Sequence, residues 1–271
     1  MTIKNFHGRV NVEIRDAVAY VNLARADKHN ALDWDMFCGL VAAAKYLRKN
    51  REVRAVILSG DGPSFCSGLD VPSFSKAPSK GLRMFLKFGR MTNLAQRVAW
   101  CWRKLPMPVI AVIQGRCYGG GLQIALACDF RYATPNAELS VMEVKWGLIP
   151  DMTGSVTLRE LLPMDKAKEL TMTGRTFTGT EAKLLNLVTD VTSEPLAAAE
   201  KLAAQISGRS PDAVAAAKTL FHKTWVASVW CAFAIETYLQ WRMFFSRNQR
   251  VAMKAGMAKK PPQFGPRQFN G

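Results

Sequence analysis

Two glycine-rich turns, each placed directly after an apolar run, constrain this chain more than any other feature. The first turn reads FCSGLD at 65–70 and follows the apolar run 53–59. The second reads YGGGL at 118–122, follows the apolar run 108–113 and leads into an amphipathic stretch. A helix that begins on glycines leaves its first backbone N–H groups free. Two such turns that converge can therefore offer two donors to one oxygen atom, as enzymes do for a developing oxyanion.

The order of apolar patterns predicts an α/β fold with crossover connections. Period-two alternation and short buried runs indicate strands at 10–14, 18–23, 53–58, 108–113, 129–133 and 139–141. A helical pattern follows Asp33, which is a good N-cap, and continues to Asn50. A second helix is expected over 81–104, after a loop rich in Pro, Ser and Lys at 72–80.

Beyond residue 195 the pattern becomes wholly helical, with predicted helices at 195–207, 211–222 and 227–246. We therefore expect two parts, an α/β core over residues 1–200 that holds the site and a helical segment over 201–271. The apolar fraction of 49% excludes a wholly disordered chain. No run is long enough to span a membrane.

The six cysteines form no Cys-x-x-Cys pair and lie mostly in apolar surroundings. We interpret them as reduced thiols, which favours a cytoplasmic location. The three histidines have neither metal-ligand spacing nor a nearby serine and aspartate in hydrolase order, so no metal site is expected.

The formal net charge of +16 suggests an anionic partner. No acidic residue follows Glu236, whereas seven basic residues do: Arg242, Arg247, Arg250, Lys254, Lys259, Lys260 and Arg267. They alternate with Met, Phe, Tyr and Trp at helical spacing, which is typical of the solvated face of a packed helix. Since no nucleic-acid-binding motif accompanies them, we do not expect a nucleic-acid partner.

Ordered sequence blocks along nearly the whole chain resemble the crotonase, or enoyl-CoA hydratase/isomerase, superfamily. Five segments resemble family patterns, in chain order. They are 25–32 (R-P-x-x-x-N-A-L), 65–70 (F-x-A-G-x-D), 114–121 (N-G-x-x-x-G-G-G), 129–133 (C-D-x-x-x-A) and 142–150 (P-E-x-x-x-G-x-x-P), and 173–175 and 181–183 continue the order. One glycine motif is weak evidence, but this many blocks in order are specific.

This resemblance implies a spiral of ββα units followed by a helical trimerisation region, and a homotrimer or a hexamer. It implies that the backbone N–H groups of Leu69 and Gly120 hold the thioester oxygen of an acyl-CoA. Contacts with the coenzyme A portion are implied for Ser67, Asp70, Val71 and Lys28, besides Leu69 itself. Coenzyme A enters as part of the substrate, and no other cofactor is implied.

Glu143 matches one of the two acid/base glutamates of the family's hydratases. The other is expected two positions after the glycine triplet, where this chain has Gln123. Gln123 can contact a substrate by hydrogen bonding, but an amide cannot exchange a proton as a base. The substitution argues against two-glutamate hydration, whereas family members that move a double bond work with the single glutamate.

Asp151 stands eight residues after Glu143 and directly after Pro150, where hydratases usually have glycine. An aspartate at the matching place is catalytic in dienoyl-CoA isomerases and is the nucleophile of a CoA-linked dehalogenase. The dehalogenase lacks an acid at the position of Glu143. An equally weighted interpretation makes Asp151 the N-cap of a helix that begins near Thr153.

The sequence thus predicts an acyl-CoA enzyme that transfers a proton next to a CoA thioester through a stabilised enolate. Isomerisation of a double bond by Glu143, with or without Asp151, fits the residues better than hydration, which is the commoner family activity. The alternative is a non-catalytic acyl-CoA-binding protein with a degenerate site.

Overall fold

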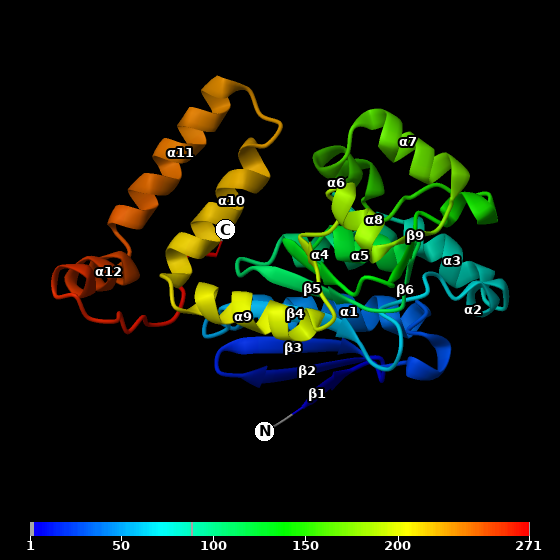
Figure 1. Cartoon of the computed structure of the whole chain (residues 1–271), viewed down its shortest axis with the longest axis horizontal. Helices are drawn as coiled ribbons and strands as arrows, with labels where there is room; N and C mark the ends of the chain where they lie inside the picture. The colour runs from blue at the N-terminus through cyan, green and yellow to red at the C-terminus, as the bar shows by residue number, and fades with distance from the viewer. Residues whose placement is uncertain (1–2, 88, 271) are drawn as a thin grey trace.

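The computed structural model describes residues 3–87 and 89–270, and it has a mixed α/β fold built on two sheets (Figure 1). The larger sheet has the order β1-β2-β3-β4-β5-β7-β10 and the smaller has the order β6-β8-β9. The β1-β2-β3 portion is antiparallel, and β3, β4, β5, β7 and β10 run parallel. The predicted α/β class is confirmed.

The strands of the larger sheet are β1 (Lys4–Phe6), β2 (Val10–Arg15), β3 (Val18–Leu23), β4 (Ala55–Gly60), β5 (Val109–Ile113), β7 (Phe130–Ala133) and β10 (Asp190–Val191). Those of the smaller sheet are β6 (Arg116–Tyr118), β8 (Glu138–Ser140) and β9 (Phe177–Thr178). The core helices are α1 (Trp34–Lys49), α2 (Val71–Ser75), α3 (Pro78–Phe85), α4 (Leu94–Arg103), α5 (Gly120–Leu126), α6 (Gly154–Leu161), α7 (Met164–Thr173), α8 (Gly179–Leu184) and α9 (Pro195–Ser207), with 3-10 turns η1 (Ala26–Lys28) and η2 (Glu143–Trp146).

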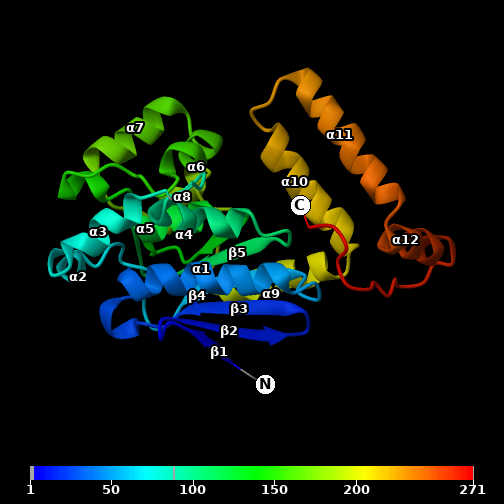
Figure 2. The ribbon, with the colours of Figure 1, turned by 180° about the vertical axis from the view of Figure 1, so that it is seen from behind.

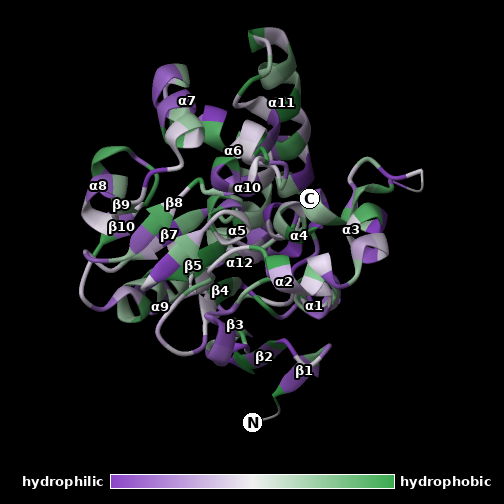
Figure 3. Ribbon diagram, turned by 90° about the vertical axis from the view of Figure 1, so that its right-hand side faces the viewer, coloured by the Kyte–Doolittle hydropathy of each residue, from purple (hydrophilic) through white to green (hydrophobic). Residues whose placement is uncertain are grey.

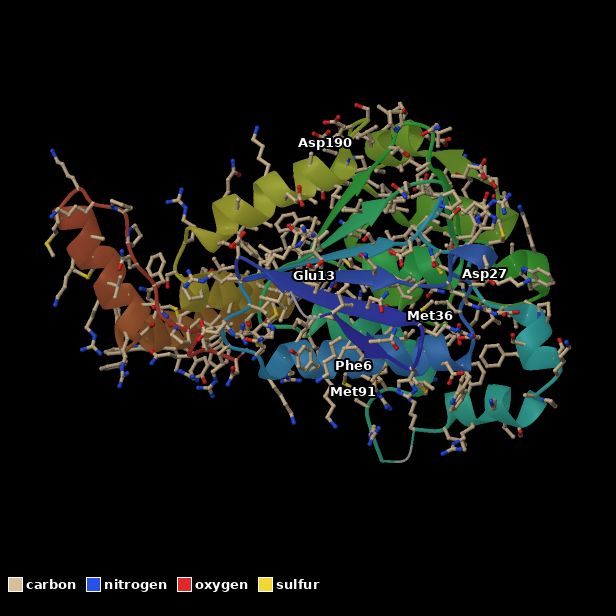
Figure 4. The ribbon with its side chains drawn as sticks, turned by 90° about the horizontal axis from the view of Figure 1, so that it is seen from below. Phe6, Glu13, Asp27, Met36, Met91 and Asp190 are labelled. Atoms are coloured by element: carbon tan, nitrogen blue, oxygen red, sulfur yellow. The ribbon has the colours of Figure 1, made fainter. Side chains whose placement is uncertain are left out.

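Helices cover both faces of the central strands, which explains why these strands are continuous apolar runs. In β4, Val56 and Leu58 belong to the core shared with α1 and α4, while Ala55 and Ile57 face α9. Figure 4 shows α9 crossing the sheet on the face opposite α1. Since α9 packs on the sheet, it belongs to the α/β core. The helices that project from the core follow α9 in the sequence.

The C-terminal helices form a separate hairpin that projects from the core (Figures 1 and 2). They are α10 (Pro211–Thr224), α11 (Val229–Phe244) and α12 (Arg247–Met257). A small core of Ala215, Ala216, Leu239 and Phe269 joins α10, α11 and the C-terminal tail. Buried Asp212 fixes the returning tail, since its Oδ1 accepts hydrogen bonds from the backbone N–H groups of 268 and 269 at 2.6 and 2.8 Å.

The prediction of one helix over 81–104 is wrong. The chain forms α3, then an extended loop, and then α4, and Phe88 within this stretch lies outside the described residues. Asn93 begins α4 with a reciprocal capping box, in which Asn93 and Gln96 each accept the other's backbone N–H. The loop protrudes beside α3 (Figure 3), and Figure 4 labels Met91 on it. The Asn-x-x-Gln spacing was the missed signal.

At each position of the glycine triplet, a different structural constraint disfavours a larger residue. Gly119 has φ +49°, a region that L side chains rarely adopt. A Cβ on Gly120 would lie 2.8 Å from the sulfur of Met152. A Cβ on Gly121 would lie 2.7 Å from the backbone oxygen of Cys66, which holds the second turn against the first.

No helix among the described residues is both long and apolar enough to cross a membrane. All six cysteines are free thiols. Burial raises the pKa of the thiols of Cys66 and Cys128 to about 12, so these two resist ionisation at neutral pH.

We expect Gly121→Ala to lower the free energy of unfolding by about 1–3 kcal/mol, because its methyl group meets backbone that cannot move aside cheaply. Gly256→Ala is the matched control, since Gly256 lies in α12 with nothing within 4 Å of an added Cβ. That substitution should leave stability unchanged or raise it by up to about 1 kcal/mol. Urea unfolding followed by circular dichroism measures both, and equal midpoints for the two variants would contradict the steric argument.

Candidate active site

The two glycine turns lie against each other. Cys66 in the first turn donates its N–H to the oxygen of Arg116 at 2.9 Å, and its own oxygen accepts the N–H of Tyr118 at 3.0 Å. A Cβ built on Gly68 would lie 3.0 Å from the oxygen of Tyr118. This close approach brings the start of α5 beside the first turn, as the sequence predicts.

Leu69 and Gly120 both line one cavity of about 500 Å³. Their neighbours' amides are engaged: Asp70 donates its N–H to Leu32 at 3.1 Å, and Gly119 donates to Ser140 at 2.9 Å. Among the described residues, the N–H groups of Leu69 and Gly120 have no acceptor. Two unengaged backbone donors therefore occur on the wall of the same cavity, from the two turns.

Glu143 begins η2 and presents its carboxyl group to this cavity. Its side chain is held from one side only, because Oε1 accepts a hydrogen bond from Gln123 Nε2 at 2.6 Å. Oε2 is buried and has no partner among the described residues. Gly119 allows this approach, since a Cβ there would lie 3.4 Å from Oε1. Oε2 is therefore the carboxyl oxygen whose hydrogen-bonding capacity is unused.

Burial is the main cause that raises the pKa of Glu143 above its ordinary value. The hydrogen bond from Gln123 opposes this rise, and the negative charge of Asp151 adds to it. A carboxyl group with a raised pKa is suited to give and take protons near neutral pH.

Gln123 lies behind Glu143, and the described residues that line the cavity do not include it. Its amide is used at both ends, because Oε1 accepts the backbone N–H of Gly154 at 2.9 Å while Nε2 donates to Glu143. The side chain thus bridges α5, η2 and the start of α6. This position differs from the predicted contact with substrate and makes Gln123 a residue that orients Glu143.

Asp151 lines the cavity together with Glu143, and burial raises its pKa. The helix after it, α6, begins at Gly154 and has Thr153 at its N-cap without a side-chain capping bond. The interpretation of Asp151 as a helix cap is therefore wrong. Two carboxyl groups of elevated pKa face one cavity.

The residues expected to meet coenzyme A divide into two groups. Ser67 and Val71 line the cavity. Lys28 is exposed on η1, and its backbone oxygen accepts the hydroxyl of Ser67 at 3.3 Å. Asp70 has a structural role, because it caps α2 through the N–H of Ser73 and pairs with Arg25 at 2.7 Å.

Most of the remaining wall is apolar, and its large members are Phe37, Met84, Phe85, Met142, Trp146, Leu148, Ile149 and Met152. The members near Glu143 were not predicted from the sequence. The signal was present, because Trp146, Leu148 and Met152 lie within a few residues of Glu143 and Asp151. A short 3-10 turn followed by a loop places them around the carboxyl groups.

Comparison with known proteins decides the family. The model for "Enoyl-CoA hydratase/isomerase" matches residues 13–267. The chain belongs to the enoyl-CoA hydratase/isomerase family. This finding confirms the resemblance seen in the sequence blocks, and the proteins named in this family are enzymes of the lyase or isomerase class.

Similar members of the family carry different activity names. The chain is 32% identical to a peroxisomal Delta(3,5)-Delta(2,4)-dienoyl-CoA isomerase of Arabidopsis thaliana, with 92% of each chain covered. It is 29% identical to a mitochondrial methylglutaconyl-CoA hydratase of Mus musculus, with 91% of this chain and 79% of the relative covered. A solved enoyl-CoA hydratase of Bacillus anthracis superposes with a TM-score of 0.86 at 26% identity, with 94% of this chain and 98% of that chain covered.

We expect Gln123→Leu to raise the pKa of Glu143 further, because it removes the hydrogen bond that favours the charged carboxylate. The carboxyl resonance of Glu143 in protein labelled with ¹³C-glutamate, assigned by its loss in Glu143→Gln, reports the titration. Gln249→Leu is the control, since Gln249 lies on the remote helix α12 and contacts Met253. A titration midpoint that stays in place or moves down in Gln123→Leu would refute the orienting role.

Proposed function

We propose that this protein isomerises a carbon–carbon double bond in an enoyl-CoA thioester, with Glu143 and Asp151 as the two proton-transferring groups. One observation carries the proposal. Two carboxyl groups with raised pKa values line one apolar cavity, whereas the residue at the second hydratase position, Gln123, lies behind Glu143 as an amide. The similarity to a dienoyl-CoA isomerase supports it.

In the proposed reaction the free N–H groups of Leu69 and Gly120 bind the thioester oxygen. A proton next to a thioester is too weakly acidic to be removed at neutral pH unless the negative charge that develops is met by donors already in place. Removing one such donor from an enzyme typically costs about 10²–10³ in rate. The contact between the two turns supports this role, since it presents both N–H groups at one cavity.

Glu143 Oε2 then removes a proton from C2 of a 3-enoyl thioester, and the electron pair moves to the thioester oxygen. Asp151 in its acid form returns a proton to C4 as the electrons flow back, which places the double bond between C2 and C3. One proton leaves and one arrives, so the product is an isomer. Exchange with solvent resets the two carboxyl groups.

We also propose that the chain works as a homotrimer or a dimer of trimers, assembled through the C-terminal helices. Several large apolar side chains on α11 and its flanks are solvent-exposed in the single chain, among them Trp230 at 80% and Phe245 at 75%. Exposed apolar patches of this kind mark interfaces. The predicted cytoplasmic location, and coenzyme A as the only coenzyme and as part of the substrate, belong to the same proposal and fit six free thiols.

We expect Glu143→Gln and Asp151→Asn each to lower the isomerisation rate by about 10²–10⁴, because each removes a proton-transferring group. The substrates are 3-enoyl-CoA and 3,5-dienoyl-CoA, and mass spectrometry separates isomerisation, which leaves the mass unchanged, from addition of water. Asp165→Asn, an exposed change in the first turn of α7, is the control and should keep full activity.

Four results would count against this assignment. Unchanged rates in Glu143→Gln would remove its role as base, and unchanged rates in Asp151→Asn would leave Glu143 to carry the proton alone. Acyl-CoA binding without conversion of any enoyl-CoA would favour the non-catalytic alternative. A product heavier by one water would indicate hydration.

For the assembly, we expect sedimentation of the purified chain to give a trimer or a hexamer. Trp230→Glu should shift the distribution toward smaller species, because it places a charge in the proposed interface. Leu184→Glu, an equally exposed position on α8, should leave the distribution unchanged. A monomer at micromolar concentration would contradict the assembly.

A further inference from the structure

The cavity wall carries acidic side chains without basic ones. Among the described residues that line it, Glu143 and Asp151 alone have carboxyl groups, and none is Lys, Arg or His. This contrasts with the chain as a whole, whose formal net charge is +16. A ligand group that enters the cavity therefore meets two carboxyl groups and, among the described lining residues, no cation.

The polar side chains of the wall are already in use or are neutral. The hydroxyl of Tyr118 bonds to Glu138, and that of Ser67 bonds to Lys28. The side-chain oxygens of Asn93 and Gln96 accept the hydrogen bonds of the capping box of α4, so only their neutral side-chain N–H groups remain. Neutral donors can accept a carbonyl or a hydroxyl group, but they do not balance a buried charge.

The rim of the cavity is apolar and open to solvent. Phe85 on α3, Trp146 at the end of η2, and Leu148 and Ile149 after it are 52%, 61%, 52% and 74% exposed. A hydrocarbon chain that covers these side chains removes apolar surface from water on both partners, at about 25 cal/mol per Å². Each added methylene should therefore tighten binding until the rim is covered.

We propose that the cavity selects a neutral, apolar acyl chain that extends to this rim, and that it rejects acyl groups with a second carboxylate. The proposal rests on the function proposed above, because it concerns the same cavity. It adds the chemical class of the acyl group. A second carboxylate would lie near two acidic side chains in a largely apolar space, and burial of an unpaired charge is costly.

Binding of saturated thioesters tests the proposal without any turnover. Hexanoyl-CoA and its ω-carboxyl counterpart, hexanedioyl-CoA, share the coenzyme and the chain length, so their ratio of dissociation constants isolates the terminal charge. At pH 8 we expect the dicarboxylic ligand to bind at least tenfold more weakly by calorimetry. From butanoyl-CoA to octanoyl-CoA we expect a few-fold tightening per methylene. Equal affinities for the matched pair, or no binding of either ligand, would overturn the proposal.

A charge placed on the rim provides the second test. Phe85→Lys puts a cation on α3, a different element from those that carry the two carboxyl groups, and should reduce or invert the preference for hexanoyl-CoA. Leu184→Lys is the control, because this residue is 80% exposed on α8 and lies outside the cavity wall. If both lysine variants keep the wild-type ratio, the cavity charge does not set the selectivity. These outcomes are independent of isomerisation, since saturated chains have no double bond to move.

Discussion

The pairing of the two glycine turns is the interaction on which the rest of the site depends. Cys66 bonds through both its N–H and its oxygen to the strand that leads into the second turn. This pairing leaves room only for hydrogen at Gly121, which packs against Cys66. The buried strands β4 and β5 run parallel, so the two turns that follow them lie at the same edge of the sheet. The pairing of these buried strands therefore also brings the free N–H groups to one cavity.

Gln123 shows how a change in one residue type can keep a geometry and change its chemistry. An amide donates to one neighbour and accepts from another, and Gln123 does both, with Glu143 and with Gly154. A carboxylate at this place could accept from Gly154 but would need a proton to donate to Glu143. The amide therefore orients Glu143 without adding a second acid, and the second carboxyl group of the cavity comes from Asp151 instead.

Much of this could be predicted from the sequence, because the signals were local. The N-cap at Asp33, the helix 195–207 and the apolar central strands follow from spacing and residue type, and the structure has them at nearly the same residues. The resemblance of the ordered blocks to the family also identified Glu143 and Asp151 as candidate site residues. The break between α3 and α4 was missed because apolar periodicity continues across it, while the capping box at Asn93 decides it. The role of Gln123 could not be derived, because it depends on a backbone N–H thirty-one residues away.

The surface around α2 and α3 and the cavity wall differ in charge. Between Asp70 and Asp129 the sequence has no acidic residue, and its cations include Lys76, Lys80 and Arg83 on or beside α2 and α3, outside the described lining of the cavity. Positive potential on that outer surface attracts an anionic group and speeds its arrival. The cavity wall itself holds carboxyl groups and apolar side chains. In the proposed reaction, the phosphates of coenzyme A are therefore suited to the outside and the acyl chain to the inside. The proposed ligand has this same division, because coenzyme A carries its phosphates at the end opposite the acyl chain.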